Sequence, residues 1–236
     1  MRFLLEDINS ILNPKIWDEN KQLKQEVANK LDEITNRFIN GVEEKGLDLN
    51  ILDRRVVGSN ASYNYTDFSD LDIHIIVDLD NFSNKNLIKL LLDFYKSAFN
   101  KKYDIKIKGI NVELYFEEKG NNLISNGVYS LDTKEWVKEP VQQEIVEVDI
   151  SDTLQYMLEK YEQVLLLNNK EEAQKLLDYL HENRQRSLSL EGEFGVDNLV
   201  FKEFRNRGYI DKLKEIIVNG ESFELSLESL KEKFAI

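Results

Sequence analysis

The chain has 236 residues, 42% of them hydrophobic, so it is long enough for one sizeable core or two packed subdomains. It has no cysteine and only two histidines, which excludes disulfides and thiolate metal sites and argues against zinc. The formal net charge of −13 opposes non-specific binding of long DNA or RNA. Any metal ion is therefore expected to be held by oxygen ligands.

The N-terminal residues 1–12 alternate apolar with acidic side chains, which does not fit a signal peptide. No stretch approaches the ~20 consecutive apolar residues of a membrane-spanning helix. We expect a cytoplasmic protein with no membrane partner.

The first 150 residues mix helical and strand patterns. Residues 20–42 and 87–99 carry apolar side chains at helical spacing, and Ser83 or Asn84 is the expected cap of the second helix. Apolar alternation predicts strands over residues 54–57, 70–77, 105–116, 127–131 and 136–137.

After residue 150 the pattern becomes wholly helical. Helices are predicted over residues 152–167, 170–186 and 196–204, and a turn with a short amphipathic helix over residues 219–236.

These patterns predict an α/β fold of the α+β type with two parts. Residues 1–150 are expected to form a small mixed sheet with helices on one face, and residues 151–236 an all-helical C-terminal subdomain.

The most informative stretch is Val56-Val57-Gly58-Ser59, followed by Asp70-Leu71-Asp72-Ile73. Successive side chains of a strand point to opposite faces, so Asp70 and Asp72 are expected on one face and the apolar residues on the other. Two neighbouring carboxylates repel each other unless a cation lies between them, and their oxygens suit magnesium.

A third acid lies in Ile110-Asn111-Val112-Glu113-Leu114-Tyr115-Phe116, where alternation sends Glu113 to the face opposite the apolar residues. Three carboxylates can hold two metal ions. We therefore predict Asp70, Asp72 and Glu113 as catalytic residues and metal ligands.

Gly58-Ser59, the Asp70-x-Asp72 pair and the later acid Glu113 resemble the motifs of the polymerase-β-type nucleotidyltransferase superfamily in order and spacing. The resemblance implies a nucleotidyltransferase palm, a nucleoside triphosphate substrate such as ATP, and two Mg²⁺ or Mn²⁺ ions. It also implies transfer of a nucleoside monophosphate to a hydroxyl acceptor with release of pyrophosphate. By this resemblance Gly58 and Ser59 hold the triphosphate.

The segments that flank these motifs look similar to predicted nucleotidyltransferases of large tailed bacteriophages. This likeness would place the protein in the cytoplasm of the host cell. It does not indicate the acceptor, for which a small molecule, a nucleotide, an RNA end and a protein side chain all stay open.

The loop between the two motifs is rich in Asn, Ser and Tyr, and we predict Asn60 and Ser69 as further nucleotide-binding residues. It lacks the Arg-Gly or Lys-Gly often seen after Gly-Ser in the family. Positive charge for the triphosphate is therefore expected from Lys202 and Arg205, three apart on one helix. A second possible source is the lysine group 101, 102, 106 and 108.

Three alternatives stay open. Asp70 and Asp72 could simply cap a strand at a turn. A nucleotidyltransferase fold could also serve as a non-catalytic nucleotide-binding or protein-interaction module. A phosphohydrolase would be expected to gather metal-ligating histidines beside its aspartates, and here only His74 shares their strand face.

Overall fold

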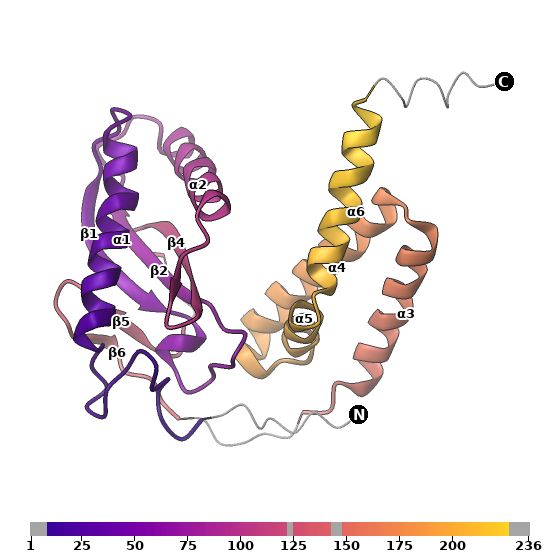
Figure 1. Ribbon diagram of the computed structural model, residues 1–236, viewed down its shortest axis with the longest axis horizontal. Coiled ribbons are helices and arrows are strands. Elements are labelled where there is room, and N and C mark those ends of the chain that lie inside the picture. Colours follow the sequence, from indigo (N-terminus) through magenta and orange to yellow (C-terminus); the bar gives the residue numbers. More distant parts are fainter. Residues whose placement is uncertain (1–8, 122–124, 143–147, 227–236) are drawn as a thin grey trace. The chain divides into compact units, whose positions relative to one another are not determined.

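The structure is a computed structural model that describes residues 9–121, 125–142 and 148–226. These residues form two compact units, one of residues 9–142 and one of residues 148–226. The first unit is coloured indigo to pink in Figure 1, and the second orange to yellow.

One mixed sheet forms the centre of the first unit, with strand order β3-β4-β2-β1-β5-β6. Strands β2 and β4 run parallel, whereas all other neighbours run antiparallel. The strands are β1 (Asn50–Val57), β2 (Leu71–Asp78), β3 (Lys106–Ile107), β4 (Ile110–Glu118), β5 (Val128–Ser130) and β6 (Trp136–Lys138). With the helices of both units, this sheet confirms the predicted α+β class.

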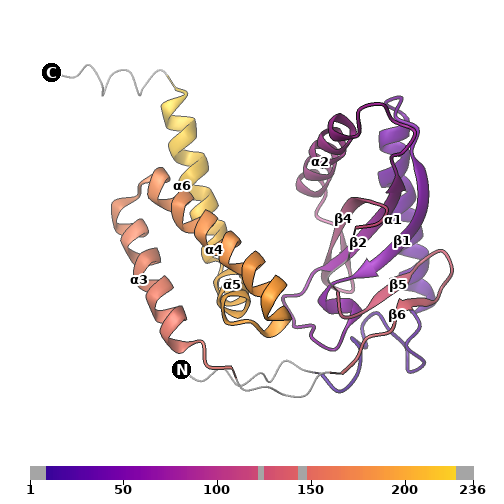
Figure 2. The same ribbon diagram turned by 180° about the vertical axis from the view of Figure 1, so that it is seen from behind.

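Helix α1 (Gln25–Glu43) covers one face of the sheet. Its buried residues recur at helical spacing, so they form one apolar face that packs in the same core as the strands. The helix lies in front of the sheet in Figure 1 and behind it in Figure 2. Phe38 of α1 stacks on Phe116 of β4 with ring centroids 4.6 Å apart, and it meets Phe99 of α2 (Lys85–Lys102) edge-on at 4.8 Å. These contacts join both helices and the sheet in one core.

Helix α2 (Lys85–Lys102) starts at Asn84, whose side chain accepts a hydrogen bond from the Leu87 amide at 3.1 Å, as predicted. Near its other end, the Asn100 side chain bonds both backbone groups of Leu114, at 3.0 and 3.3 Å. An exposed strand edge invites pairing with another chain, so this contact protects part of β4.

The single strand predicted over residues 105–116 is wrong, since it is two strands joined by a tight turn. Lys108 (φ 52°) and Gly109 (φ 83°) both adopt left-handed backbone angles and reverse the chain between β3 and β4. Alternation alone does not reveal such a turn, because the apolar pattern continues through both strands.

The second unit contains α3 (Ser151–Leu167), α4 (Lys170–Leu190), α5 (Val196–Asn206) and α6 (Tyr209–Glu224), with one apolar core. The turn predicted at residue 219 is wrong, because α6 continues to Glu224. A Cβ on Gly220 would lie 2.7 Å from the Lys170 Cβ, so this glycine permits close contact with α4. The rest of the predicted C-terminal helix, residues 227–236, lies outside the described residues.

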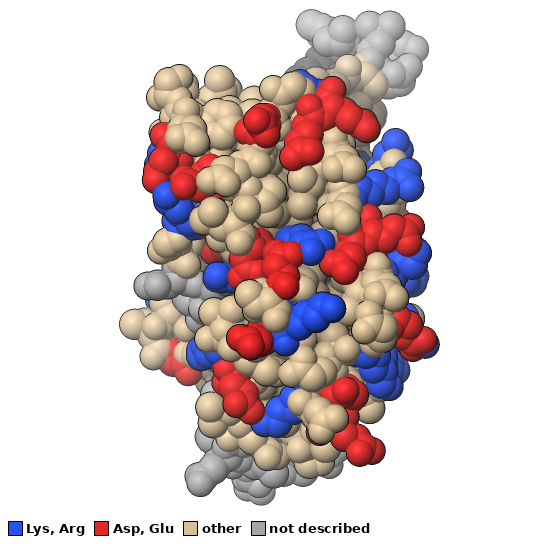
Figure 3. Space-filling model, turned by 90° about the vertical axis from the view of Figure 1, so that its left-hand side faces the viewer, with Lys and Arg blue, Asp and Glu red and all other residues tan. Residues whose placement is uncertain are grey.

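Within the described ranges, no helix combines the length and the apolar character needed to cross a bilayer. On the face shown in Figure 3, acidic and basic side chains are interspersed rather than gathered by sign. That face therefore offers no continuous basic surface for a long polyanion.

Candidate functional site

The sheet face opposite α1 carries a row of polar side chains on the two parallel strands. Asp72 and His74 of β2 are the register partners of Glu113 and Tyr115 of β4, and Glu117 follows on the same face. All five side chains are half-buried, whereas the residues between them on β2 are buried in the core. The alternation read from the sequence is thus confirmed for Asp72 and Glu113.

Asp70 immediately precedes β2, two residues before Asp72. Its carboxylate accepts a hydrogen bond from the Asn111 side chain at 3.4 Å, and its backbone carbonyl accepts one from Asn60 at 2.9 Å. Asn111 neighbours Val112, the register partner of Leu71, so the bond links the ends of β2 and β4.

Gly58 lies directly against Asp72. It follows β1 with φ 73° and opens the short 3₁₀ turn Ser59–Ala61. A Cβ at position 58 would be 2.2 Å from Asp72 Oδ2, so a larger residue there would force this carboxylate to move. The predicted Gly-Ser turn and the predicted aspartate are therefore neighbours in space.

Tyr115 bonds one of the three acids, Glu113, and the sequence analysis missed it. Its hydroxyl donates a hydrogen bond to Glu113 Oε2. Burial raises the pKa of Tyr115 well above its usual value, and the hydrogen bond to Glu113 and the negative charges of Glu113, Asp72 and Asp70 raise it further. The alternation that located Glu113 also puts Tyr115 on the same face, so this signal was present in the sequence.

His74 shares this face but is held by other groups. Its Nδ1 lies 2.6 Å from Glu117 Oε2, and its ring packs on Tyr115 with centroids 5.0 Å apart. A histidine bonded in this way gives little support to the phosphohydrolase alternative, which needs histidine ligands beside the aspartates.

Two of the predicted nucleotide contacts, Asn60 and Ser69, are bonded within the protein. Asn60 is fully buried, and its side chain bonds Asn13 and the backbone carbonyls of Ser69 and Asp70. Ser69 is also buried, and its hydroxyl accepts a hydrogen bond from the Thr66 amide at 2.9 Å. Both side chains are occupied in bonds that hold the loop near the start of β2, and their predicted contact with a nucleotide stays a prediction.

The surroundings of Gly58 include a cation that the sequence analysis did not consider. The Gly58 amide donates a hydrogen bond to Ser125 Oγ at 3.1 Å, and Lys138 Nζ donates one to the Ser125 carbonyl at 2.6 Å. Lys138 belongs to the edge strand β6, and no local sequence signal ties it to Gly58. Ser59 is half-buried, and its carbonyl closes the turn through Ser62.

Lys202 and Arg205 lie on α5 of the second unit, both half-buried. Their predicted contact with a triphosphate stays a prediction.

The acids were expected to bind metal ions, and their chemistry suits magnesium, which prefers oxygen ligands. Among residues 9–121, 125–142 and 148–226, however, no three acidic or histidine side chains are close enough together to hold a metal ion. The carboxylates of Asp70 and Glu113 are instead bonded to Asn111 and Tyr115.

Comparisons with known proteins identify no family for this chain. No protein-family model, no curated protein and no solved structure matches the chain.

Proposed function

We propose that the protein is a metal-dependent nucleotidyltransferase that transfers a nucleoside monophosphate from a triphosphate to a hydroxyl acceptor. The observation that carries the proposal is the pairing of Asp72 with Glu113 across two parallel strands, with Asp70 two residues earlier and Gly58 against Asp72. A strand-capping role would explain one aspartate but not a second strand that presents an acid in register.

In this proposal the carboxylates of Asp70, Asp72 and Glu113 turn toward one another to hold Mg²⁺ or Mn²⁺, because as they stand the three are not close enough together to do so. When bound there, such an ion would supply positive charge for the phosphates and would lower the pKa of the attacking hydroxyl. Glu113 then faces the acceptor, and Tyr115 holds Glu113 in place by donating to one oxygen. A hydrogen bond to a ligating carboxylate typically orients it.

The triphosphate is proposed to lie along the turn that Gly58 and Ser59 form. Lys138, reached from Gly58 through Ser125, would supply one positive charge from the same unit. Lys202 and Arg205 are the other proposed source.

A second candidate is a non-catalytic module that binds a nucleotide or a protein on the same fold. The hydrogen bond from Tyr115 favours it, because it occupies an oxygen of Glu113 that a metal ion would otherwise use.

The two candidates differ in whether pyrophosphate is released. The full chain should be incubated with each nucleoside triphosphate and Mg²⁺ or Mn²⁺, alone and with hydroxyl acceptors, and pyrophosphate measured. Metal-dependent release supports the transferase. Saturable nucleotide binding without release supports the module.

A further inference from the structure

A groove runs between helices α1 and α2, on the side of the sheet away from the three acids. Its volume is about 850 Å³, which lies in the range of about 300–1,000 Å³ that small-molecule sites usually have. A Cβ on Gly41 would be 2.2 Å from the hydroxyl oxygen of Tyr95, so this glycine lets the tyrosine lie against α1. The groove is therefore large enough for a ligand of ordinary size.

Aromatic rings form the α2 wall of the groove. Tyr95, Phe99 and Tyr103 follow one another at intervals of four residues, with ring centroids 6.0 and 4.8 Å apart. Phe38 of α1 packs on Tyr95 at 5.2 Å and on Phe99 at 4.8 Å. Because the rings support one another and the core, this wall is rigid.

Two cations from different helices converge at one end of the groove. The Arg37 guanidinium of α1 lies 5.4 Å from the ring centroid of Tyr103, and Lys102 Nζ of α2 lies 4.9 Å from it. Hydrogen bonds from Lys102 and Arg37 to the Tyr103 hydroxyl lower the pKa of this tyrosine. Both cations thus point their donors at a single oxygen, which is how an oxygen of a bound anion would be held. At the other end, Lys45 Nζ lies 5.2 Å from the ring centroid of Tyr95.

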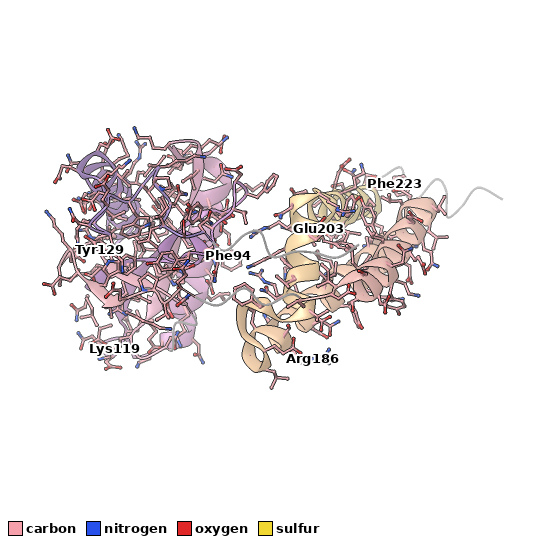
Figure 4. The ribbon with its side chains drawn as sticks, turned by 90° about the horizontal axis from the view of Figure 1, so that it is seen from below. Phe94, Lys119, Tyr129, Arg186, Glu203 and Phe223 are labelled. Carbon is pink, nitrogen blue, oxygen red and sulfur yellow. The ribbon has the colours of Figure 1, made fainter. Side chains whose placement is uncertain are left out.

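These three cations have no acidic partner within the described part of the chain. Arg37, Lys45 and Lys102 form no ion pair with any carboxylate of residues 9–121, 125–142 and 148–226. Lys119, which Figure 4 labels on the same unit, shows the contrast, because it bonds two aspartates at 2.7 and 2.5 Å. The chain carries a net charge of −13, so three such cations around one groove indicate a site for an anion.

Two acids, Glu33 and Glu44, also line the groove. Glu33 bonds Lys30 at 2.5 Å, so a cation outside the lining balances its charge. The lining therefore keeps a net positive charge.

We propose that this groove binds a small phosphorylated molecule, whose phosphate accepts hydrogen bonds from Arg37 and Lys102. A phosphate monoester carries about −1.5 to −2 charges at pH 7 and three acceptor oxygens, which suits two cationic donors better than a carboxylate does. Asn36 and Asn40, one turn apart on α1, also line the groove and can bond polar groups on the rest of the molecule. The strongly negative net charge disfavours a long nucleic acid as the ligand. This inference is independent of the proposed transferase activity.

The first test measures the binding of inorganic phosphate to the full chain by ¹H–¹⁵N NMR. The protein is freed of metal ions with a chelating resin, so that the three acids cannot hold phosphate through a bound cation. Phosphate should shift the backbone amide signals of residues 33–45 and 95–103 in a saturable way. Acetate at the same concentrations should bind more weakly, because a carboxylate offers less charge and fewer oxygens.

The second test compares variants by the same titration. Arg37→Ala and Lys102→Ala should each weaken phosphate binding about tenfold or more, as the loss of a charge-assisted hydrogen bond does. Lys119→Ala is the matched control, because it makes the same change at a lysine whose charge aspartates already balance, and it should leave the affinity unchanged. Lys138→Ala should also bind phosphate normally, since Lys138 belongs to the surroundings of Gly58. Arg37 and Lys102 are exposed, so both variants should stay folded, which circular dichroism checks.

Three results would overturn the proposal. In the first, phosphate shifts no signal of residues 33–45 and 95–103. In the second, Lys102→Ala and Lys119→Ala weaken binding equally, which would show attraction by overall charge alone. In the third, acetate binds as tightly as phosphate. Sedimentation with vesicles that contain phosphatidic acid separates a soluble ligand from a lipid headgroup. We expect no protein in the pellet, and sedimentation that Arg37→Ala and Lys102→Ala abolish would overturn the assignment to a small molecule.

Discussion

Asp72 and Glu113 face each other across the parallel strands β2 and β4, where their Cα atoms are register partners. Neighbouring parallel strands keep equivalent side chains on one face, so the pair cannot separate without a change of register. This relationship gives the candidate site a rigid base on the sheet, while Asp70 and Gly58 reach it from adjoining loops.

Tyr115→Phe removes only the hydroxyl that donates to Glu113. The ring keeps its packing on His74, so the fold should persist. Loss of a bond that orients a ligating carboxylate typically weakens metal binding about tenfold or more. Titration with Mn²⁺, followed by its paramagnetic resonance signal, measures this. Unchanged or tighter Mn²⁺ binding would contradict the orienting role and instead identify Tyr115 as a competitor of the metal.

Gly58→Ala should disturb the site through Asp72. Gly46→Ala is a matched control, because Gly46 has a similar φ of 85°. A Cβ added at Gly46 would meet no atom within 4 Å, whereas a Cβ at Gly58 would meet Asp72 Oδ2. Both variants should lose roughly 1–2 kcal/mol of unfolding free energy from the left-handed backbone. Only Gly58→Ala should also weaken Mn²⁺ binding. Equal Mn²⁺ affinity in the two variants would refute the proposal that the metal ion binds next to Gly58.

Asn60→Ala tests the structural role of Asn60. It leaves the carbonyls of Ser69 and Asp70 and the Asn13 side chain without their buried partner. The expected loss is about 2–4 kcal/mol of unfolding free energy, measured by urea denaturation. Ser59→Ala serves as the comparison and should weaken triphosphate binding with little change in stability. The assignment fails if Asn60→Ala is as stable as the wild type.

Lys138→Ala tests the source of positive charge for the triphosphate. Loss of a charge-assisted contact typically costs roughly 1–3 kcal/mol of binding free energy. Calorimetric titration at low salt should compare this variant with the Lys202→Ala, Arg205→Ala double variant. A loss in Lys138→Ala alone would assign the role to the sheet unit, and a loss in the double variant alone would assign it to α5. With neither affected, the charge must come from the lysine group 101, 102, 106 and 108.

The sequence predicted the features that depend on local periodicity. Alternation placed Glu113 opposite the apolar residues of β4, and the strand pairing then brought it beside Asp72. The same pattern could not separate a loop residue that contacts a ligand from one that holds the backbone, and it did not predict that Asn60 and Ser69 are bonded within the protein. Asn, Ser and Asp favour both roles, and only tertiary contacts decide between them.

Contacts between residues that are far apart in the sequence could not be predicted from it either. Lys138 is tied to Gly58 through Ser125, a link between distant strands that no spacing reveals. A turn was predicted at residue 219, yet Gly220 lies within α6 and permits close contact with Lys170. On α2, periodicity predicted an apolar buried stripe but gave no sign that a second one, at Leu90 and Phe94, would be exposed.

The most direct test of the account is metal-dependent pyrophosphate release by the wild type and by Asp72→Asn. The account predicts release by the wild type with Mg²⁺ or Mn²⁺ and at least one triphosphate, and none above background by the variant. Asp72→Asn should unfold at the same or a slightly higher temperature, because the change removes repulsion from Asp70 and Glu113. Equal release by both proteins, or a melting temperature lowered by many degrees in the variant, would contradict a catalytic role for Asp72.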